Sequence, residues 1–247
     1  MRRSMSGSVL VVCPAFNESG SVAAVVAEIR SELPRAQVLV VDDGSTDRTS
    51  AIARAAGARV LTLPFNIGVG GALRAGLLLG HREGVAAVVQ CDADGQHPAT
   101  AIASLVDALD EADIVVGARW AGTGDYVARG PRRWAMRLLA AVISRVHRTR
   151  LTDVTSGFRA FGPRAIGVLS RELPPEYLGD TLDALMIARA AHLRVAQVPV
   201  AMRARTTGVP SHHPLRAAAY LLRAVLVLAL SLVRLIPLRR GPSGSPP

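Results

Sequence analysis

Short apolar runs rich in valine, isoleucine and leucine recur along the first half of the chain, and longer amphipathic stretches separate them. Runs of this kind are typical of strands that are buried on both faces of a parallel sheet. Their alternation with helical patterns predicts an α/β fold. The expected strands are Val9–Cys13, Val38–Val41, Val60–Leu63, Val85–Cys91 and Ile114–Val116.

Capping signals mark where the intervening helices begin. Serine is favoured at the N-cap of a helix and proline in its first turn. The expected starts are Ser19 or Ser21 for a helix that runs to Ser31, Ser45 for a helix through Ala56, and Pro98 for the next helix.

The second half of the chain is less regular. The glycine-rich stretch 121–130 is expected to form a mobile loop ahead of a basic helix, 132–148. A further helix, 180–192, leads into a strand, Val195–Val200. A polar segment, Arg203–Pro214, then precedes the last apolar helix.

The last helix, Leu215–Leu238, carries three arginines, and its longest uncharged run is about ten residues. Such a run measures roughly 15 Å, half of a hydrocarbon core, so it is too short to span a membrane comfortably. At about 100° per residue, Arg216, Arg223 and Arg234 fall on one stripe. This pattern predicts a helix that lies in a membrane interface or packs against a partner, such as a second copy in a homodimer.

The expected division of the chain is a catalytic domain over 1–212, an amphipathic helix over 213–240 and a disordered tail over 241–247. The apolar run after the basic start is too short for a signal peptide, which predicts a cytoplasmic location. Cys13 and Cys91 are the two cysteines and are expected to be small core residues.

The chain of 247 residues has a formal net charge of +10, and all of its 29 basic residues are arginines. This excess favours an anionic partner, which is a phosphorylated ligand, an acidic membrane surface or a nucleic acid. Aromatic residues make up only 4% of the chain and are not interleaved with basic strands, which argues against binding of single-stranded nucleic acid.

Two carboxylates follow the fourth expected strand, in the sequence Cys91-Asp92-Ala93-Asp94-Gly95-Gln96. If this segment is extended, Asp92 and Asp94 point the same way and can share a hard cation, with Gln96 as a neutral oxygen ligand. The cation is then Mg²⁺ or Mn²⁺. A solvated turn is the alternative.

Polar clusters also follow the first two expected strands. They are Pro14-Ala15-Phe16-Asn17-Glu18 and Asp42-Asp43-Gly44-Ser45-Thr46-Asp47. Helix capping explains either one alone, but three successive strand ends with acidic or amide groups indicate a ligand site, because parallel sheets bind ligands at this edge. The segment Gly68–Gly71 lacks the third glycine of a dinucleotide fingerprint and is read as a helix start or a close approach to a ligand.

The ordered fragments PAFNE, VVDDGSTDRT, FNIGVGGALRAG, QCDADGQHP and TSGFRAF resemble glycosyltransferase family 2. Within that family the sequence is similar to polyprenyl-phosphate sugar transferases of the dolichol-phosphate mannosyltransferase type. The resemblance covers residues 9–208. It implies a GT-A type nucleotide-diphospho-sugar transferase fold with a C-terminal amphipathic helix.

The resemblance also assigns donor-side roles to residues of this chain. It implies that the ion and the donor diphosphate are held by Asp92, Asp94 and Gln96, with Asp94 also counted as catalytic. The positions that it assigns to the nucleotide pocket are Pro14, Ala15, Asn17, Glu18, Asp42, Asp43, Asp92 and Ala93, with Asp42 in a supporting role.

On the acceptor side the resemblance assigns Arg119, Arg133 and Arg205 to the acceptor phosphate. Asp183 lies near a position that is acidic in relatives, and it or Asp180 is the candidate base if the acceptor is a hydroxyl. This sequence departs from relatives at Gln197, where they often have glutamate, and in the segment 208–211.

The implied function is inverting transfer of a hexose of mannose or glucose type from a GDP-, UDP- or dTDP-linked donor to a polyprenyl phosphate. The reaction is expected at the cytoplasmic membrane face, on a peripheral enzyme. Two alternatives stay open. One is a family 2 transferase that extends a hydroxyl of a cell-envelope glycan or glycolipid, and the other is a non-catalytic binding module.

Overall fold

The computed structural model describes residues 8–119, 131–174 and 179–203. All of them belong to the unit Met1–Val209. The expected loop 121–130, the C-terminal helix and the tail lie outside the described residues, so these expectations and the division at residue 212 stay predictions.

A sheet of seven strands forms the centre of this unit, in the order β3-β2-β1-β4-β6-β5-β7. All six strands expected from the sequence are present. Pairing is parallel except for β6, which runs antiparallel to β4 and β5 and was not predicted. The strands are β1 Val9–Ala15, β2 Gln37–Asp42, β3 Arg59–Thr62, β4 Ala87–Gln90, β5 Ile114–Ala118, β6 Arg159–Phe161 and β7 Val195–Pro199.

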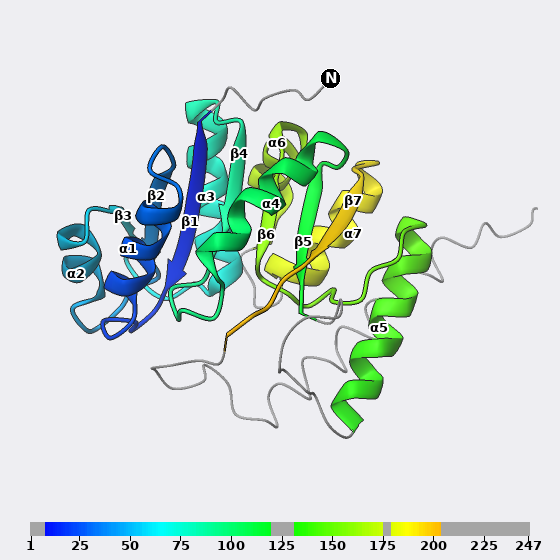
Figure 1. Ribbon diagram of the computed structural model, residues 1–247, viewed down its shortest axis with the longest axis horizontal. Helices are drawn as coiled ribbons and strands as arrows, with labels where there is room; N and C mark the ends of the chain where they lie inside the picture. Colours follow the sequence, from blue (N-terminus) through cyan, green and yellow to red (C-terminus); the bar gives the residue numbers. More distant parts are fainter. Residues whose placement is uncertain (1–7, 120–130, 175–178, 204–247) are drawn as a thin grey trace, which may run out of the picture. The chain divides into compact units, whose positions relative to one another are not determined.

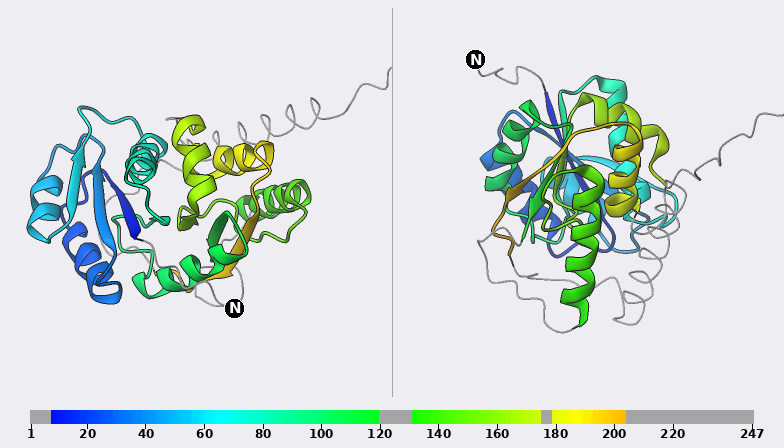
Figure 2. Two further views of the ribbon diagram at one scale, coloured as in Figure 1. Left: turned by 90° about the horizontal axis from the view of Figure 1, so that it is seen from above. Right: turned by 90° about the vertical axis from the view of Figure 1, so that its right-hand side faces the viewer.

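Helices cover both faces of the sheet (Figures 1 and 2). One layer contains α1, α2 and α4, and the other contains α3, α6 and α7. The three-layered α/β arrangement confirms the predicted fold class. The helices are α1 Val22–Glu32, α2 Thr49–Ala55, α3 Val69–Glu83, α4 Ile102–Asp107, α5 Pro131–His147, α6 Pro163–Glu172 and α7 Ala184–Ala190, with 3₁₀ turns at Ala99–Ala101 and Ala108–Asp110 and a π-helical turn at Gly179–Asp183.

The predicted start at Ser45 is wrong, whereas the start at Ser21 is confirmed without the expected capping bond. Ser45 does not cap α2, which begins at Thr49; instead the Ser45 N–H donates to Asp42 Oδ1 at 2.9 Å. Ser21 occupies the N-cap of α1, but its hydroxyl donates to Glu18 Oε2 at 2.8 Å rather than accepting an amide of the helix. The Ser45 hydroxyl accepts the Asn17 N–H at 2.9 Å, so both serine side chains make other local bonds in place of a cap.

Helix α3 packs very closely on the sheet because two of its four glycines lie against strands. A Cβ atom on Gly76 would lie 2.5 Å from Val12, and one on Gly80 would lie 2.7 Å from Val88. Gly68 is the N-cap of this helix, with φ of 92°. The glycine-rich segment is therefore a helix start, which is one of the two readings given to it.

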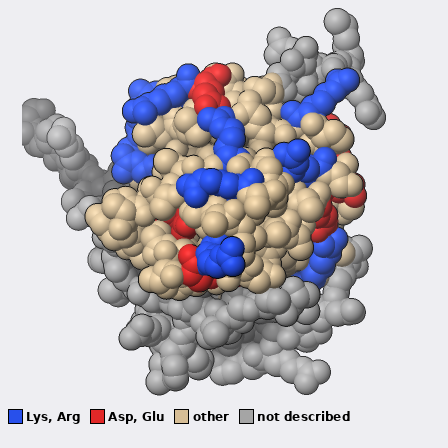
Figure 3. Space-filling view, turned by 90° about the vertical axis from the view of Figure 1, so that its left-hand side faces the viewer, with Lys and Arg blue, Asp and Glu red and all other residues tan. Residues whose placement is uncertain are grey.

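Figure 3 looks onto the side of the unit that carries α2 and β3, where arginines are spread over the face with few acidic side chains among them. The exposed arginines of α1, the α1–β2 turn, α2 and β3 are Arg30, Arg35, Arg48, Arg54 and Arg59. They are dispersed rather than gathered in one groove.

The turn after β2 depends on Gly44, and we expect Gly44→Ala to be strongly destabilising. Gly44 has φ of 73°, and a Cβ there would meet the backbone of Phe65 and Asn66 at 2.7 Å. Gly84 is the matched control, because its φ is 64° and nothing lies within 4 Å of the same position. We expect Gly84→Ala to cost about 1 kcal/mol of unfolding free energy and Gly44→Ala at least ~2 kcal/mol. Denaturant unfolding measures both, and equal losses would show that the contact is unimportant.

Candidate active site

A pocket of about 130 Å³ lies at the edge of the sheet where β4, β5 and β7 end and β6 begins. It brings together Asp92, Gln96 and Arg119, which the sequence analysis selected from separate segments. The carboxyl ends of parallel strands are the usual ligand edge of an α/β sheet. The pocket is lined by Asp92, Gln96, His97, Arg119, Thr155, Ser156, Gly157, Met202 and Arg203.

The two aspartates of the D-x-D motif lie in different surroundings. β4 ends before them, and residues 93 and 94 form a turn in which Gly95 has φ of 78°. The motif is therefore not extended, and the prediction that its two side chains point the same way along a strand is wrong. The Asp92 side chain is 34% exposed and lines the pocket. Asp94 is buried, and its Oδ1 accepts the Gln96 N–H at 3.0 Å.

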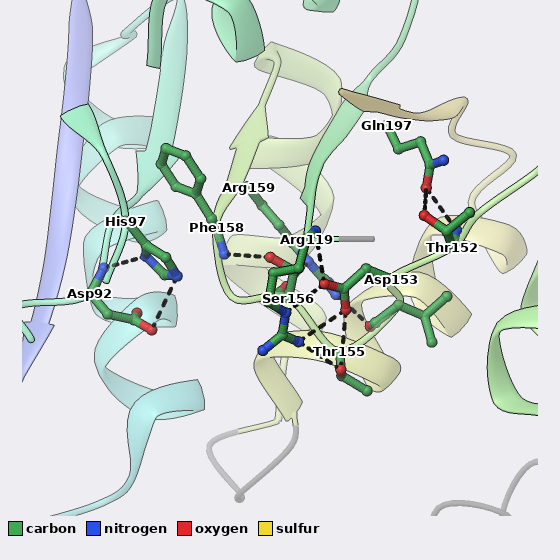
Figure 4. Close-up of polar contacts among 11 residues, drawn as sticks. Asp92, His97, Arg119, Thr152, Asp153, Thr155, Ser156, Phe158, Arg159 and Gln197 are labelled. Carbon is green, nitrogen blue, oxygen red and sulfur yellow. Dashed lines mark hydrogen bonds and ion pairs between the residues drawn. The ribbon is translucent and has the colours of Figure 1, made fainter. Parts of the chain in front are cut away.

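His97 holds Asp92 in place (Figure 4). Its Nδ1 accepts the Asp92 N–H at 2.9 Å, its Nε2 lies 3.8 Å from Asp92 Oδ2, and its ring stacks on Phe158 with centroids 4.8 Å apart. Burial lowers the pKa of His97, but the charges of Asp92 and Asp94 raise it, and the net pKa is raised. Because Nδ1 is an acceptor, the proton of the neutral ring is on Nε2, facing the carboxylate.

Arg119 is fixed by a buried carboxylate at the far side of the pocket (Figure 4). Asp153, whose side chain is fully buried, accepts from Arg119 Nε at 2.6 Å, from Nη2 at 3.0 Å and from the backbone N–H at 3.2 Å. Thr155 Oγ1 accepts a further bond from Nη2 at 3.0 Å. The guanidinium is thus oriented before any ligand binds, which is how arginine is best used for anions.

Arg159 organises the loop that precedes β6. Its side chain is fully buried and donates to the carbonyl oxygens of Val154, Ser156 and Thr181, each at 2.8 Å. One cation therefore ties the loop 154–157 to the π-helical turn that ends at Asp183. A lysine has no planar fork of donors and could not make these three bonds together.

Gln197, the residue that departs from relatives, supports the same loop. Its Oε1 accepts from the Thr152 N–H at 2.7 Å and from the Thr152 hydroxyl at 3.3 Å. Only an acceptor is required for these two bonds. The neutral amide of Gln197 therefore accepts these bonds as a carboxylate would, without adding a second negative charge next to Asp153.

Gly157 lets this loop come close to the D-x-D segment. A Cβ at this position would lie 3.3 Å from Asp92 Oδ2 and 3.2 Å from Gln90 Nε2. Both distances are tighter than ordinary contacts. The loop before β6 and the segment after β4 therefore form two walls of the pocket with the Asp92 carboxylate between them.

The residues assigned to the nucleotide lie together at the ends of β1 and β2. Both carboxylate oxygens of Asp43 accept backbone N–H groups, from Ile67 and Gly68, at 2.8 Å. Burial raises the pKa of Asp43, although these two bonds oppose the rise. Asn17, with φ of 55°, accepts the Thr46 N–H at 2.9 Å.

Hydrogen bonds also link this cluster to the rest of the site. Glu18 is half-buried, its N–H donating to Thr49 Oγ1 and its carboxylate accepting from Ser21. Pro14 and Ala15 are buried in β1, and Asp42, at the end of β2, is buried. Ala93, also buried, joins the pocket side to this side because its N–H donates to the Pro14 carbonyl oxygen at 3.4 Å.

Some predicted acceptor residues are not placed in the pocket. Asp183 is half-buried at the end of the π-helical turn, and the described lining includes neither it nor Asp94. Arg133 lies on α5, but its side chain and that of Asp180 are outside the described part of the structure. Arg205 also lies outside the described residues. Their roles stay predictions.

Asp153 and six of the nine residues that line the pocket were not predicted as site residues. His97 belongs to the QCDADGQHP fragment, but no pattern gave it a partner. Asp153 is a single carboxylate between a basic helix and the TSGFRAF fragment. Its position as a lone acidic residue near arginines could have predicted that it pairs with one of them. Arg203 reaches the pocket beyond β7 and pairs with Glu28, 175 residues away, which no local pattern reveals.

The sequence model of the family described as glycosyl transferase family 2 matches residues 10–170. This chain belongs to that family. The motifs that resemble it are thus confirmed, and the chain is a glycosyltransferase with a GT-A fold. The alternative of a non-catalytic binding module is set aside.

The family 2 chain is similar to several characterised proteins. The undecaprenyl-phosphate mannosyltransferase of Micrococcus luteus is 32% identical over 212 residues, which covers 81% of this chain and 85% of that protein. A UDP-N-acetylglucosamine–dolichyl-phosphate N-acetylglucosaminyltransferase of Methanococcus voltae is 28% identical and covers 78% and 84%. The structure of glucosyl-3-phosphoglycerate synthase from Mycobacterium tuberculosis, in complex with Mn²⁺, UDP and glucosyl-3-phosphoglycerate, superimposes with a TM-score of 0.62 at 25% identity, covering 92% and 80%.

The candidate metal ligands of this transferase fit a cation that is also coordinated by a bound ligand. Among the described residues no group of three or more His, Cys, Asp or Glu side chains could hold a metal ion. Asp92 and Gln96, however, both line the pocket. Mg²⁺ and related hard cations are commonly bound by one or two carboxylates together with substrate phosphates. The residues present therefore fit such an ion, with Asp92 as its carboxylate.

We expect the Arg119–Asp153 pair to be strongly coupled in stability. Removing one partner leaves the other desolvated and unpaired, so Asp153→Asn should cost about 1.5–3 kcal/mol of unfolding free energy. A double-mutant cycle with Arg119→Gln should give a coupling of at least ~1 kcal/mol. The exposed Arg59–Glu83 pair, also bidentate, is the control and should give less than ~1 kcal/mol. Similar couplings in the two cycles would contradict this picture.

The Glu28–Arg203 pair predicts a dependence of stability on pH. The hydrogen bond with Arg203 lowers the pKa of Glu28 below its ordinary value of 4.5. Its contribution is therefore complete above about pH 4.5 and is lost as the pH falls through the lower, folded-state pKa. Glu28→Gln should lower the melting temperature at pH 7, by an amount that matches about 0.2–1 kcal/mol for a partly exposed pair, and this difference should shrink steadily as the pH is lowered below 4.5. Melting curves across this range, with the exposed Glu111→Gln as control, test the prediction.

Proposed function

We propose that this transferase moves a hexose, of mannose or glucose type, from a nucleotide sugar to a polyprenyl phosphate at the cytoplasmic face of the membrane, with inversion. The observation that carries the proposal is the pocket itself. A partly exposed carboxylate, Asp92, and a pre-oriented arginine, Arg119, border one small cavity at the ligand edge of the sheet. Two relatives named for transfer to lipid phosphates support this choice of acceptor.

The donor side of the reaction needs positive charge near the leaving diphosphate. When bound, a divalent ion supplies Lewis-acid stabilisation of that leaving group. Asp92 and Gln96 would hold it, with Asp94 as the second carboxylate, and His97 keeps Asp92 oriented through its backbone N–H. Asn17, Glu18 and Asp43, at the ends of β1 and β2, are the residues proposed for the nucleotide. Mn²⁺ in the related UDP complex supports a divalent ion of the Mg²⁺ or Mn²⁺ class.

The acceptor side needs an oriented anion rather than a strong base. A phosphate monoester is largely ionised near neutral pH, since its second pKa is about 6, so its oxygen can attack the anomeric carbon without losing a proton to the protein. Arg119 is held by Asp153 and offers a fixed donor to such a phosphate. Arg133 and Arg205 are proposed to join it. Asp183 would matter as a base only if the acceptor were a hydroxyl.

Attachment to the membrane surface is proposed to come from amphipathic segments. Within the described residues, no helix has the length and apolarity needed to cross a bilayer. Helix α5 exposes Leu138 between the exposed Arg137 and Arg145. The stripe of Arg216, Arg223 and Arg234 in the predicted helix 213–240 repeats this combination of apolar surface and arginine, which suits an interface rich in lipid phosphates.

The test is transfer of radiolabelled sugar from GDP-, UDP- and dTDP-linked donors to polyprenyl phosphate by the full-length protein, with Mn²⁺ or with a chelator. We expect labelled lipid with one donor, loss of labelling with chelator, and a fall on the order of 100-fold or more for Asp92→Asn, because several kcal/mol of transition-state stabilisation is removed. Asp107→Asn, an exposed carboxylate on α4, should leave the rate unchanged.

The opposite result is also informative. Absence of labelled lipid with every donor, in a preparation that still cleaves nucleotide sugar, would contradict the proposal. The acceptor would then be a hydroxyl of a cell-envelope glycan or glycolipid, and Asp183→Asn would be the next variant to measure.

A further inference from the structure

Arg203 is an arginine of the pocket to which neither the motifs nor the proposed reaction has given a role. It follows β7 and lines the same cavity as Asp92 and Arg119. Its backbone N–H donates to the carbonyl oxygen of Gln96 at 3.0 Å. Arg203 is therefore attached directly to the segment that carries the proposed ion ligands.

Glu28 fixes the side chain of Arg203. The carboxylate of Glu28, on α1, accepts from Nη1 at 2.8 Å and from Nη2 at 2.9 Å. Its Oε1 also accepts the Ala99 N–H at 3.1 Å. The mutual hydrogen bond lowers the pKa of Glu28 and raises the pKa of Arg203, so both groups are charged at neutral pH.

These contacts make Arg203 part of one rigid group with the D-x-D loop. The segment that follows the motif is tied to Arg203 at Gln96 and to Glu28 at Ala99. Any ligand held by Asp92 and Gln96 will therefore meet the Arg203 guanidinium at a constant position. Arg119, by contrast, belongs to the other wall of the pocket and is fixed by Asp153.

The negative charge of the nucleotide sugar indicates which ligand Arg203 binds. A nucleotide sugar brings a diphosphate, whose negative charge increases as the sugar leaves, and such charge is best met by pre-oriented cationic donors. Glu28 occupies two of the five N–H donors of a guanidinium, which leaves donors on the same group for a phosphate oxygen. Guanidinium groups suit this task because they stay protonated.

We propose that Arg203 binds the diphosphate of the nucleotide sugar and that Glu28 is the residue that positions it. The proposal rests on the proposed function only in that the donor is a nucleoside diphosphate sugar. It assigns Arg203 to the leaving group and Arg119 to the acceptor, so the two arginines that line the described pocket have different ligands.

The experiment measures dissociation constants of the full-length protein for GDP, UDP and dTDP in the presence of Mn²⁺, and for the matching monophosphates. We expect Arg203→Gln to weaken binding of the preferred diphosphate about 10- to 100-fold, and binding of the monophosphate by less than about threefold. Arg59→Gln is the matched control, because Arg59 makes a similar bidentate pair with Glu83 outside the pocket. It should change neither constant.

Glu28 variants separate positioning from a purely structural role. Glu28→Gln keeps an acceptor for the Ala99 N–H but loses the charge, and it should weaken diphosphate binding less than Arg203→Gln does. In the double variant the two losses should not add, because Glu28 acts through Arg203. Melting temperatures are recorded for all variants, so that a general loss of fold is recognised.

Three results would overturn the proposal. They are unchanged diphosphate affinity in Arg203→Gln, an equal loss for monophosphate and diphosphate, and a wild-type protein that binds none of the three nucleoside diphosphates. If Arg203→Gln behaves as expected but no donor labels polyprenyl phosphate, this assignment stands and the proposed lipid acceptor fails.

Discussion

The position of β1 between β2 and β4 is the constraint on which the rest of this molecule depends. Parallel pairing on both sides brings the ends of three strands to one edge of the sheet. The chain runs outward from β1 to β2 and β3 and then crosses back to β4, so the strand order reverses at this point. Ligands bind at such a reversal because the connections on either side diverge and leave a crevice. The cluster around Asp43 and the D-x-D segment follow β2 and β4, the two neighbours of β1, and the contact from Ala93 to Pro14 links the D-x-D segment to β1.

The antiparallel strand β6 gives the site its second wall. Since β6 enters the sheet from the edge where β4 and β5 end, the loop before it has to cross that edge. Hydrogen bonds from neighbouring side chains fix the conformation of this loop. Arg159 donates to its carbonyl groups, Asp153 accepts from the Thr155 hydroxyl, and Gln197 accepts the Thr152 N–H. Buried polar groups that are fully paired in this way are rigid, and rigidity is what an oriented binding surface requires.

How much of this structure could be predicted from the sequence depends on how far apart the interacting residues lie along the chain. Strands such as β1 and β2 were found because burial on both faces leaves a continuous apolar run. β6 was missed because it has three residues and one of them is the buried Arg159, whose charge is satisfied by carbonyl groups distant in sequence. The turn at Asp94 was only the alternative to an extended segment, because Gly95 and the Gln96 amide decide its conformation and the hydrophobic pattern does not. Motifs located the site; long-range pairs such as Glu28 with Arg203 completed it.

The close approach at Gly157 has a consequence for anyone who wishes to change the sugar that this enzyme accepts. The backbone there already lies against the Asp92 carboxylate, so this wall has no spare volume and cannot carry a side chain without displacing the carboxylate. Met202 is the one apolar and flexible side chain among the lining residues described. Methionine adapts its shape readily and tolerates replacement. Libraries that reshape the pocket have room to vary at residue 202, whereas residue 157 sets a fixed limit on the size of the cavity.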